Sequence, residues 1–282
     1  MDMNLVLQGP NATADMLARI GALAAPARTV AVGAHALRCE QVADSPSLRQ
    51  TIEVAASAAR LDATFIAPGR TLADFRLVAM DMDSTLITIE CIDEIADMQG
   101  LKAQVSEITE AAMRGELDFG ASLTRRVALL AGLDASALER VYSERLAISM
   151  GGEAMLAAVK AAGLKTLLVS GGFTFFTERL KERLGLDYTH ANQLEIADGK
   201  LTGRVIGTIV DADEKERTVE RVCAQMGIAP AQAIVMGDGA NDLKMMGIAG
   251  LSLAFRAKPV VQAQAAIALN YTGLDGLLAI LA

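Results

Sequence analysis

Residues 77–85 read Leu-Val-Ala-Met-Asp-Met-Asp-Ser-Thr, a short apolar run that ends in two aspartates. A run of four apolar residues bounded by polar ones is typical of a strand buried in a parallel sheet. The two carboxylates, Asp81 and Asp83, are costly to bury without a cation or other partners. Oxygen ligands of this kind suit Mg²⁺, but an isolated pair suits an ordinary helix-capping loop equally well.

Two further apolar runs end in the same way. Lys165–Val169 is followed by Ser-Gly-Gly, and Ala233–Met236 is followed by Gly-Asp-Gly. Further strands are expected at Leu251–Ala254 and Ile267–Leu269, with amphipathic helices at Glu153–Ala162 and Lys215–Met226. Buried strands that alternate with such helices predict an α/β fold with a parallel sheet. Ligands bind at the carboxyl ends of such strands, so the three polar clusters should meet in one crevice.

Two insertions interrupt this pattern. The stretch from about residue 91 to 150 is helical, with breaks at Gly100, Gly115 and Gly132, and it predicts a helical cap over the crevice. Residues 189–207 alternate around Asp198-Gly199, which favours a β-hairpin.

The first 70 residues read strand, helix, strand, helix, strand. The expected strands are Asn4–Gln8, Thr29–Val42 and Ala63–Ala67, and the expected helices are Ala12–Leu23 and Ser47–Arg60. Gly33 could divide the middle strand in two, which would give a β-α-β-β-α-β unit of the ferredoxin-like kind. Either Ser45 or Ser47 is expected to cap the second helix. Pro68-Gly69 marks a boundary, so residues 1–70 and 71–282 are expected to form two domains.

The composition excludes several classes of protein. The 282 residues include 26 Lys and Arg against 34 Asp and Glu, a net charge of −8, which argues against binding nucleic acid or anionic membranes. No uncharged apolar run reaches about 18 residues, and the N-terminus lacks the pattern of a secretory signal. Three cysteines, with no C-x-x-C pair, fit a cytoplasmic protein without disulfides.

The polar clusters together resemble the haloacid dehalogenase (HAD) superfamily of phosphotransferases. Four motifs of that superfamily occur in order, each at a predicted strand or helix end. They are D-x-D-x-T at Asp81–Thr85, a serine at Ser170, a lysine at Lys215 and G-D-x-x-x-D at Gly237–Asp242. The resemblance implies a Rossmann-like parallel sheet with an inserted helical cap.

Longer segments resemble the phosphoserine phosphatases within that superfamily. They are DMDSTLITIECIDEIAD (81–97), MRGELDFGASLTRRVALLAGL (113–133), VSGGFTFF (169–176) and MGDGANDLKMM (236–246). The resemblance covers roughly residues 75–282. Some members of the family carry an amino-acid-binding, ACT-like domain before it, and the strand and helix order of residues 1–70 is compatible with that.

The resemblance implies a Mg²⁺-dependent hydrolysis of O-phospho-L-serine, the last step of serine biosynthesis. Asp81 would be the nucleophile that forms an aspartyl-phosphate, and Asp83 the acid and then the base. The metal ligands would be the carboxylates of Asp81 and Asp238 and the backbone carbonyl of Asp83, with Asp242 positioning waters or Lys215. With oxygen ligands only, and no His or Cys near the cluster, the site should prefer Mg²⁺ to Zn²⁺.

The same resemblance assigns the substrate contacts. Ser170, the N–H groups of Gly171 and Gly172 at a helix N-terminus, Lys215 and Asn241 would surround the phosphate. Glu90 would hold the ammonium group of phosphoserine and Arg126 its carboxylate, with Met113 and Phe119 as apolar walls. Without the resemblance, Lys215 would be taken for a surface charge and Phe119 for plain core.

Two other functions stay open on the sequence. A related HAD enzyme could pass the phosphate to an alcohol such as homoserine rather than to water. A non-catalytic amino-acid sensor is the alternative from another class, although the intact acidic set argues against it. The sequence allows a homodimer and does not specify one.

Overall fold

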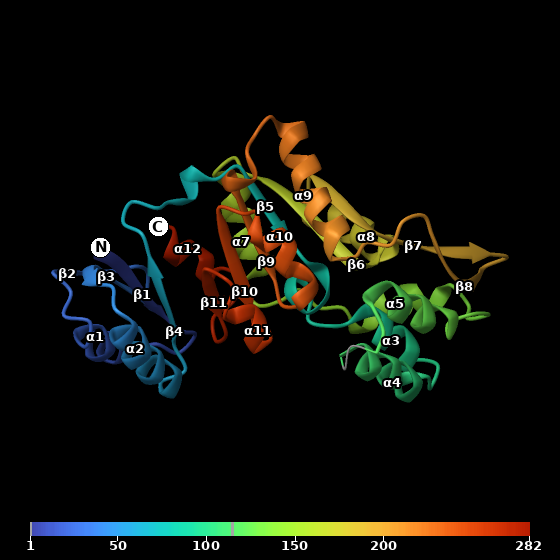
Figure 1. The fold of residues 1–282 in the computed structure, drawn as a ribbon, viewed down its shortest axis with the longest axis horizontal. Helices are drawn as coiled ribbons and strands as arrows, with labels where there is room; N and C mark the ends of the chain where they lie inside the picture. The colour runs from blue at the N-terminus through green and yellow to red at the C-terminus, as the bar shows by residue number, and fades with distance from the viewer. Residues whose placement is uncertain (1, 114–115) are drawn as a thin grey trace.

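The computed structural model describes residues 2–113 and 116–282, and they form two sheets with a helical insertion (Figure 1). The smaller sheet is antiparallel, in the strand order β2-β3-β1-β4. The larger sheet has seven strands in the order β11-β10-β9-β5-β6-β7-β8, all parallel except the β7–β8 pair. The expected α/β class with a small N-terminal α+β unit is confirmed.

The N-terminal unit has the predicted ferredoxin-like order. Its elements are β1 Asp2–Gln8, α1 Ala14–Ala22, β2 Arg28–Ala31, β3 Ala36–Ala43, α2 Pro46–Ala58 and β4 Asp62–Ile66. The middle stretch is two strands, since Gly33 turns the chain with a φ of +71°. Ser45 caps α2 by accepting from the Leu48 N–H, because Pro46 occupies the first helical position.

Strands β1, β3 and β4 of the N-terminal sheet carry the buried residues of this sheet, whereas β2 at the edge has none. One face packs on α1 and α2 around Leu5, Leu7 and Cys39. Val6 and Ile66 point the other way and belong to the main core, which also includes α12. The sheet therefore rests on the larger unit, and Figure 1 shows α12 beside it. The division near residue 70 stays a prediction about independent folding.

The larger unit is a three-layer sandwich. Its strands are β5 Leu77–Met80, β6 Lys165–Phe173, β7 Tyr188–Ala197, β8 Lys200–Ile206, β9 Ala233–Gly237, β10 Leu251–Phe255 and β11 Ile267–Leu269. Its helices are α7 Gly152–Ala161, α8 Thr174–Leu184, α9 Ala212–Met226, α10 Leu243–Gly247, α11 Pro259–Gln262 and α12 Gly276–Ile280. Alternate residues of β5 enter the two layers: Leu77 and Ala79 face α9 and α10, while Val78 and Met80 face α7 and α8.

The cap lies between β5 and β6, as predicted. Its helices are α3 Cys91–Asp97, α4 Lys102–Met113, α5 Phe119–Ala128 and α6 Ser136–Arg140. Short helical turns complete the chain at η1 Leu72–Asp74, η2 Met82–Leu86, η3 Val141–Arg145, η4 Pro230–Gln232 and η5 Ala240–Asp242. The chain enters and leaves the cap side by side, since Ile87 and Ile148 form an antiparallel bridge. Cap and N-terminal unit lie at opposite ends of the molecule (Figure 1).

The predicted hairpin at 189–207 is the β7–β8 pair, with its turn at Asp198-Gly199. It is more than an insertion, because the first half of β7 also extends the parallel sheet beside β6. No helix among the described residues is long and apolar enough to cross a membrane.

Candidate active site

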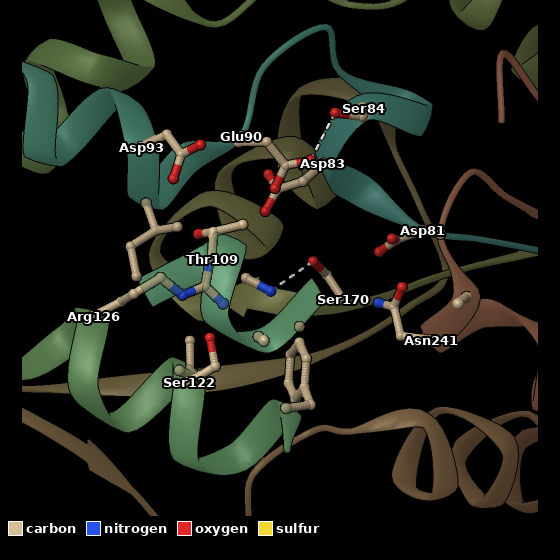
Figure 2. A pocket seen from close by; sticks show the side chains of 18 of the residues that line it. Asp81, Asp83, Ser84, Glu90, Asp93, Thr109, Ser122, Arg126, Ser170 and Asn241 are labelled. Carbon is tan, nitrogen blue, oxygen red and sulfur yellow. Dashed lines mark hydrogen bonds between the residues drawn. The ribbon is translucent and has the colours of Figure 1, made fainter. Parts of the chain in front are cut away.

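A cavity of about 730 Å³ lies between the cap and the carboxyl ends of β5, β6 and β9. The core side is lined by Asp81, Asp83, Ser170, Gly171, Gly172, Asp238 and Asn241, and the cap side by Glu90, Asp93, Thr109, Phe119, Ser122 and Arg126. Figure 2 shows the labelled members of both groups around one space. The three strand ends therefore meet in one crevice, as their polar residues predicted.

Asp81 follows β5 and is almost fully buried. Its N–H continues the sheet by donating to the Met236 carbonyl, and its Oδ1 accepts from Lys215 Nζ at 2.9 Å. Burial raises the pKa of Asp81 well above its ordinary value, against the opposing effect of Lys215. One carboxylate of the pair thus faces the cavity with a fixed cation behind it.

Lys215 lies behind the cavity rather than in its lining. The side chain is fully buried, and Nζ lies 2.9 Å from Asp81 Oδ1 and 2.8 Å from Asp242 Oδ1. Burial alone would lower the pKa of Lys215, but the carboxylates of Asp242 and Asp81 outweigh it and raise that pKa. Lys215 stays charged, and its position directs that charge to Asp81.

Asp242 connects this charge to the fourth motif. Its Oδ2 accepts from the N–H groups of Asp238 and Gly239, at 3.1 and 3.0 Å. Gly237 must lack a side chain here, since a Cβ would lie 2.3 Å from Asp242 Oδ2. Asp242 therefore positions the loop that presents Asp238.

Asp83 occupies the turn after Asp81. Its Oδ1 accepts from the Cys91 N–H at 3.4 Å. Burial raises the pKa of Asp83 to about 8, and the negative charge of Glu90 is the second cause of this rise. Ser84 in the same turn has a left-handed backbone, with a φ of +55°, which is strained for a residue with a side chain. Its hydroxyl donates to Glu90 Oε1 at 2.7 Å and so ties the turn to the start of the cap.

The second motif lies within a strand. We expected Ser170, Gly171 and Gly172 at a helix N-terminus, but β6 continues to Phe173 and α8 begins only at Thr174. The Gly172 N–H donates to Ser170 Oγ at 2.9 Å. The strand bulges here, and buried Asn192 donates to the Gly171 carbonyl at 2.7 Å. Asn192 was missed because nothing in the sequence marks it.

The donor set fits a hard divalent cation. Asp81, Asp238 and Asp242 offer carboxylate oxygens within 4.8 Å of one another, and no other group of three potential ligands of this kind occurs among the described residues. Burial raises the pKa of Asp238 to about 6, with Asp242 adding to the effect, so a cation would relieve the repulsion. The expectation that no cysteine lies near was wrong, since Cys91 adjoins Asp83. Burial raises the pKa of its thiol well above the ordinary value, which leaves it a poor ligand.

The cap side carries the expected charges. Arg126, on α5, lines the cavity, and burial lowers the pKa of its guanidinium. No hydrogen bond or ion pair of Arg126 occurs within the described part of the chain. Burial raises the pKa of Glu90, whose Oε1 is taken by Ser84. The Phe119 ring covers Gly171, where a Cβ would lie 2.7 Å from the ring.

Met113 and the histidines do not contribute described side chains to the cavity. Met113 ends α4, but its side chain lies outside the described residues. We expected no histidine near the acidic cluster, and His190 Nε2 lies 3.2 Å from Glu214 Oε1, next to Lys215 in the chain. Neither histidine is among the residues that line the cavity.

The chain is similar in sequence to a known family and to a known enzyme of that family. Residues 78–247 match the family model of haloacid dehalogenase-like hydrolases. A phosphoserine phosphatase of Polaromonas sp. is 56% identical over 216 residues, which cover 75% of this chain and 92% of that protein.

Two solved structures are also similar. The first is a probable phosphoserine phosphatase from Vibrio cholerae, unliganded, with 37% identity and a TM-score of 0.85 over 99% of this chain and 86% of that one. The second is a phospho-aspartyl intermediate analogue of a phosphoserine phosphatase, with 38% identity and a TM-score of 0.69 over 74% of this chain and 99% of that one.

Proposed function

We propose that this chain, which belongs to the haloacid dehalogenase-like hydrolase family, is a phosphatase that hydrolyses O-phospho-L-serine to serine and phosphate. The choice of substrate depends on one observation, the state of the Arg126 side chain. The guanidinium of Arg126 is half-buried in the same cavity as the carboxylate of Asp81, and its buried Nε has no hydrogen-bond partner among the described residues. Such a group favours an anion, and the carboxylate of a phosphorylated amino acid supplies one.

The first half-reaction uses the two aspartates of the first motif. Asp81 attacks phosphorus, and the bond from phosphorus to the serine oxygen breaks. A serine alkoxide leaves poorly, so a proton from Asp83 must neutralise it. Burial supports this role, because the raised pKa of Asp83 keeps it protonated near neutral pH.

The second half-reaction reverses the role of Asp83. Its carboxylate takes a proton from water, the oxygen of that water attacks the phosphorus of the aspartyl-phosphate, and Asp81 leaves as a carboxylate. Ser170, Gly171, Gly172 and Asn241 line the cavity and are proposed to bind the phosphate oxygens. The ammonium group of Lys215 stays next to Asp81 in both half-reactions.

Asp81, Asp238 and the backbone carbonyl of Asp83 are proposed to hold Mg²⁺, with Asp242 behind them. When bound, the ion would offset repulsion between the anionic nucleophile and the phosphate. A cytoplasmic location and a homodimer stay predictions.

Substitution of Arg126 in the cap tests whether phosphoserine is the substrate. We expect Arg126→Ala to lower the catalytic efficiency on phosphoserine by about 30- to 4,000-fold, since losing a charge-assisted contact costs about 2–5 kcal/mol. An aryl phosphate lacks the carboxylate, so its hydrolysis should change little. Arg126→Lys should recover part of the phosphoserine rate, because lysine lacks the planar fork.

Steady-state phosphate release by the wild type, Arg126→Ala, Arg126→Lys and Glu90→Gln measures this, with Mg²⁺ and with excess EDTA. Arg125→Ala is the matched control, since Arg125 is exposed and does not line the cavity. Equal losses on both substrates would show that Arg126 supports the fold or the general chemistry. Full activity in excess EDTA would refute the proposed requirement for Mg²⁺.

A further inference from the structure

Two polar atoms in the cap half of the cavity are buried without a hydrogen-bond partner. Among the described residues, five side-chain atoms are in this condition: Arg38 Nε, Thr64 Oγ1, Arg70 Nε, Asp93 Oδ1 and Arg126 Nε. Only Asp93 and Arg126 of these residues line the cavity. An acceptor and a donor are thus left unsatisfied in the same place, which is costly for both.

The two residues come from different cap helices. Asp93 is in the first turn of α3, and Arg126 is in the last turn of α5. Thr109 of α4 lies on the same cap side of the cavity (Figure 2). Its hydroxyl donates to the Val105 carbonyl at 3.1 Å, so that proton is not available to Asp93.

Their charges act on each other. Burial raises the pKa of Asp93, and the positive charge of Arg126 is the largest effect that lowers it. Burial lowers the pKa of Arg126, and Asp93 opposes that more strongly than Glu90 does. Glu90 already accepts from Ser84, whereas no hydrogen bond of the Asp93 carboxylate occurs in the described residues. Asp93 is therefore the cap carboxylate most available to the guanidinium.

We propose that Asp93 is a positioning residue, which accepts a hydrogen bond from Arg126 Nε and so turns the two Nη groups toward the carboxylate of the substrate. No hydrogen bond joins the pair in this structure, so a side-chain rotation must form it. A guanidinium bound in this way keeps the end-on fork free. The identity of the substrate carboxylate rests on the proposed function, while the pairing rests on the cavity alone.

A double-mutant cycle tests whether Asp93 acts through Arg126. We expect Asp93→Ala to lower the catalytic efficiency on phosphoserine about tenfold, mainly through KM, and to change hydrolysis of an aryl phosphate less than about twofold. In the Arg126→Ala background the same substitution should cost less than about twofold on phosphoserine. Asp93→Asn, which keeps an acceptor oxygen, should restore part of the loss.

Glu94→Gln is the matched control. Glu94 lies in the same first turn of α3, but it pairs with Arg145 outside the cavity. This variant loses the same favourable charge at the helix start, and we expect its efficiency on both substrates to stay at the wild-type level. Equal Asp93→Ala losses in both backgrounds, or on both substrates, would overturn the proposal.

A spectroscopic measurement separates this proposal from the proposed function. The Arg126 Nε–H signal in ¹⁵N spectra of the full chain, identified by its loss in Arg126→Ala, should exchange with solvent several-fold faster in Asp93→Ala than in the wild type. Unchanged exchange would overturn the pairing whatever the substrate is. A wild type that hydrolyses the aryl phosphate but not phosphoserine would instead overturn the proposed substrate, and the exchange rates would still decide on Asp93.

Discussion

At the residue scale, the charge arrangement around Lys215 places a fixed positive charge beside the buried nucleophile, and this charge opposes the rise that burial causes in the pKa of Asp81. Two carboxylates flank one fully buried ammonium group, at 2.9 and 2.8 Å. Removing one partner of a buried ionic group is costly because it leaves a charge without compensation. With Asp242 as its second partner, Lys215 stays compensated when Asp81 becomes covalently bound to phosphate.

The same arrangement makes Asp81→Asn a clean test of the nucleophile. The amide is nearly isosteric and leaves the Lys215–Asp242 pair in place, so the fold should persist. Turnover of every substrate should fall by more than about a thousandfold, since the attacking oxygen is lost. Phosphate release and acid-quench trapping of labelled phosphate on the protein measure this, and circular dichroism checks the fold.

The matched control is Asp213→Asn, which neutralises an exposed carboxylate paired with Lys244 in the first turn of α9. We expect wild-type activity from it. If Asp81→Asn kept activity near that of the wild type, the covalent mechanism would be wrong.

At the element scale, the ends of the strands were less predictable than the strands themselves. The strand at 77–80 and that at 267–269 have the predicted bounds. The first is a short apolar run between Arg76 and Asp81, and the second ends where Asn270 follows Leu269. Strand β6 was expected to stop at Val169, since glycines follow. It continues to Phe173 because β7 offers pairing partners and Asn192 holds the bulge, and neither is visible in the local sequence.

Asp187, just before β7, joins the starts of the two strands. It accepts from Lys165 Nζ at 2.6 Å and from the Thr166 N–H at 2.9 Å. Burial alone would raise the pKa of Asp187, but these donors outweigh it and lower the pKa. A carboxylate with a lowered pKa stabilises the fold above its unfolded pKa of about 3.9, and that contribution is lost as the pH falls through the folded pKa.

We therefore expect Asp187→Asn to lower the free energy of unfolding at pH 7 by about 1–2 kcal/mol. The difference from the wild type should shrink as the pH falls below about 4, because the wild-type carboxyl then also becomes neutral. Urea unfolding at several pH values measures this. A difference that stays constant from pH 7 to pH 3 would mean that the carboxylate charge contributes nothing.

At the scale of the whole molecule, the sequence predicted the two units and the meeting of the motifs, but not how the N-terminal unit contacts the core. The four motifs indicated which side chains meet at the strand ends, since topology alone brings those ends together. The junction of the N-terminal unit with the core was not predicted. Its polar contacts join Asp62 to residues 270–272 and Arg38 to the backbone of Ala279, Ile280 and Ala282. Such long-range pairs leave no periodic pattern.

This junction also reaches the cap. The Leu274 N–H donates to the carbonyl of Met150, where the chain leaves the cap, at 2.8 Å. The Gln8 side chain donates to the Gly276 carbonyl at 3.1 Å. The segment after β11 therefore contacts the N-terminal sheet on one side and the root of the cap on the other.

Asp62 makes the most side-chain hydrogen bonds of the contacts named at this junction. Its buried carboxylate accepts from the N–H groups of Asn270, Tyr271 and Thr272 and from the Thr272 hydroxyl, at 2.6 to 3.2 Å. An amide in its place turns an NH₂ group toward these donors, so Asp62→Asn should cost about 2–3 kcal/mol and lower Tm by roughly 5–10 °C. Thermal unfolding followed by circular dichroism measures this.

Asp44→Asn, which breaks an exposed pair with Arg49 in the same unit, should shift Tm by less than about 1 °C. Equal shifts in the two variants would mean that the junction does not depend on the Asp62 carboxylate.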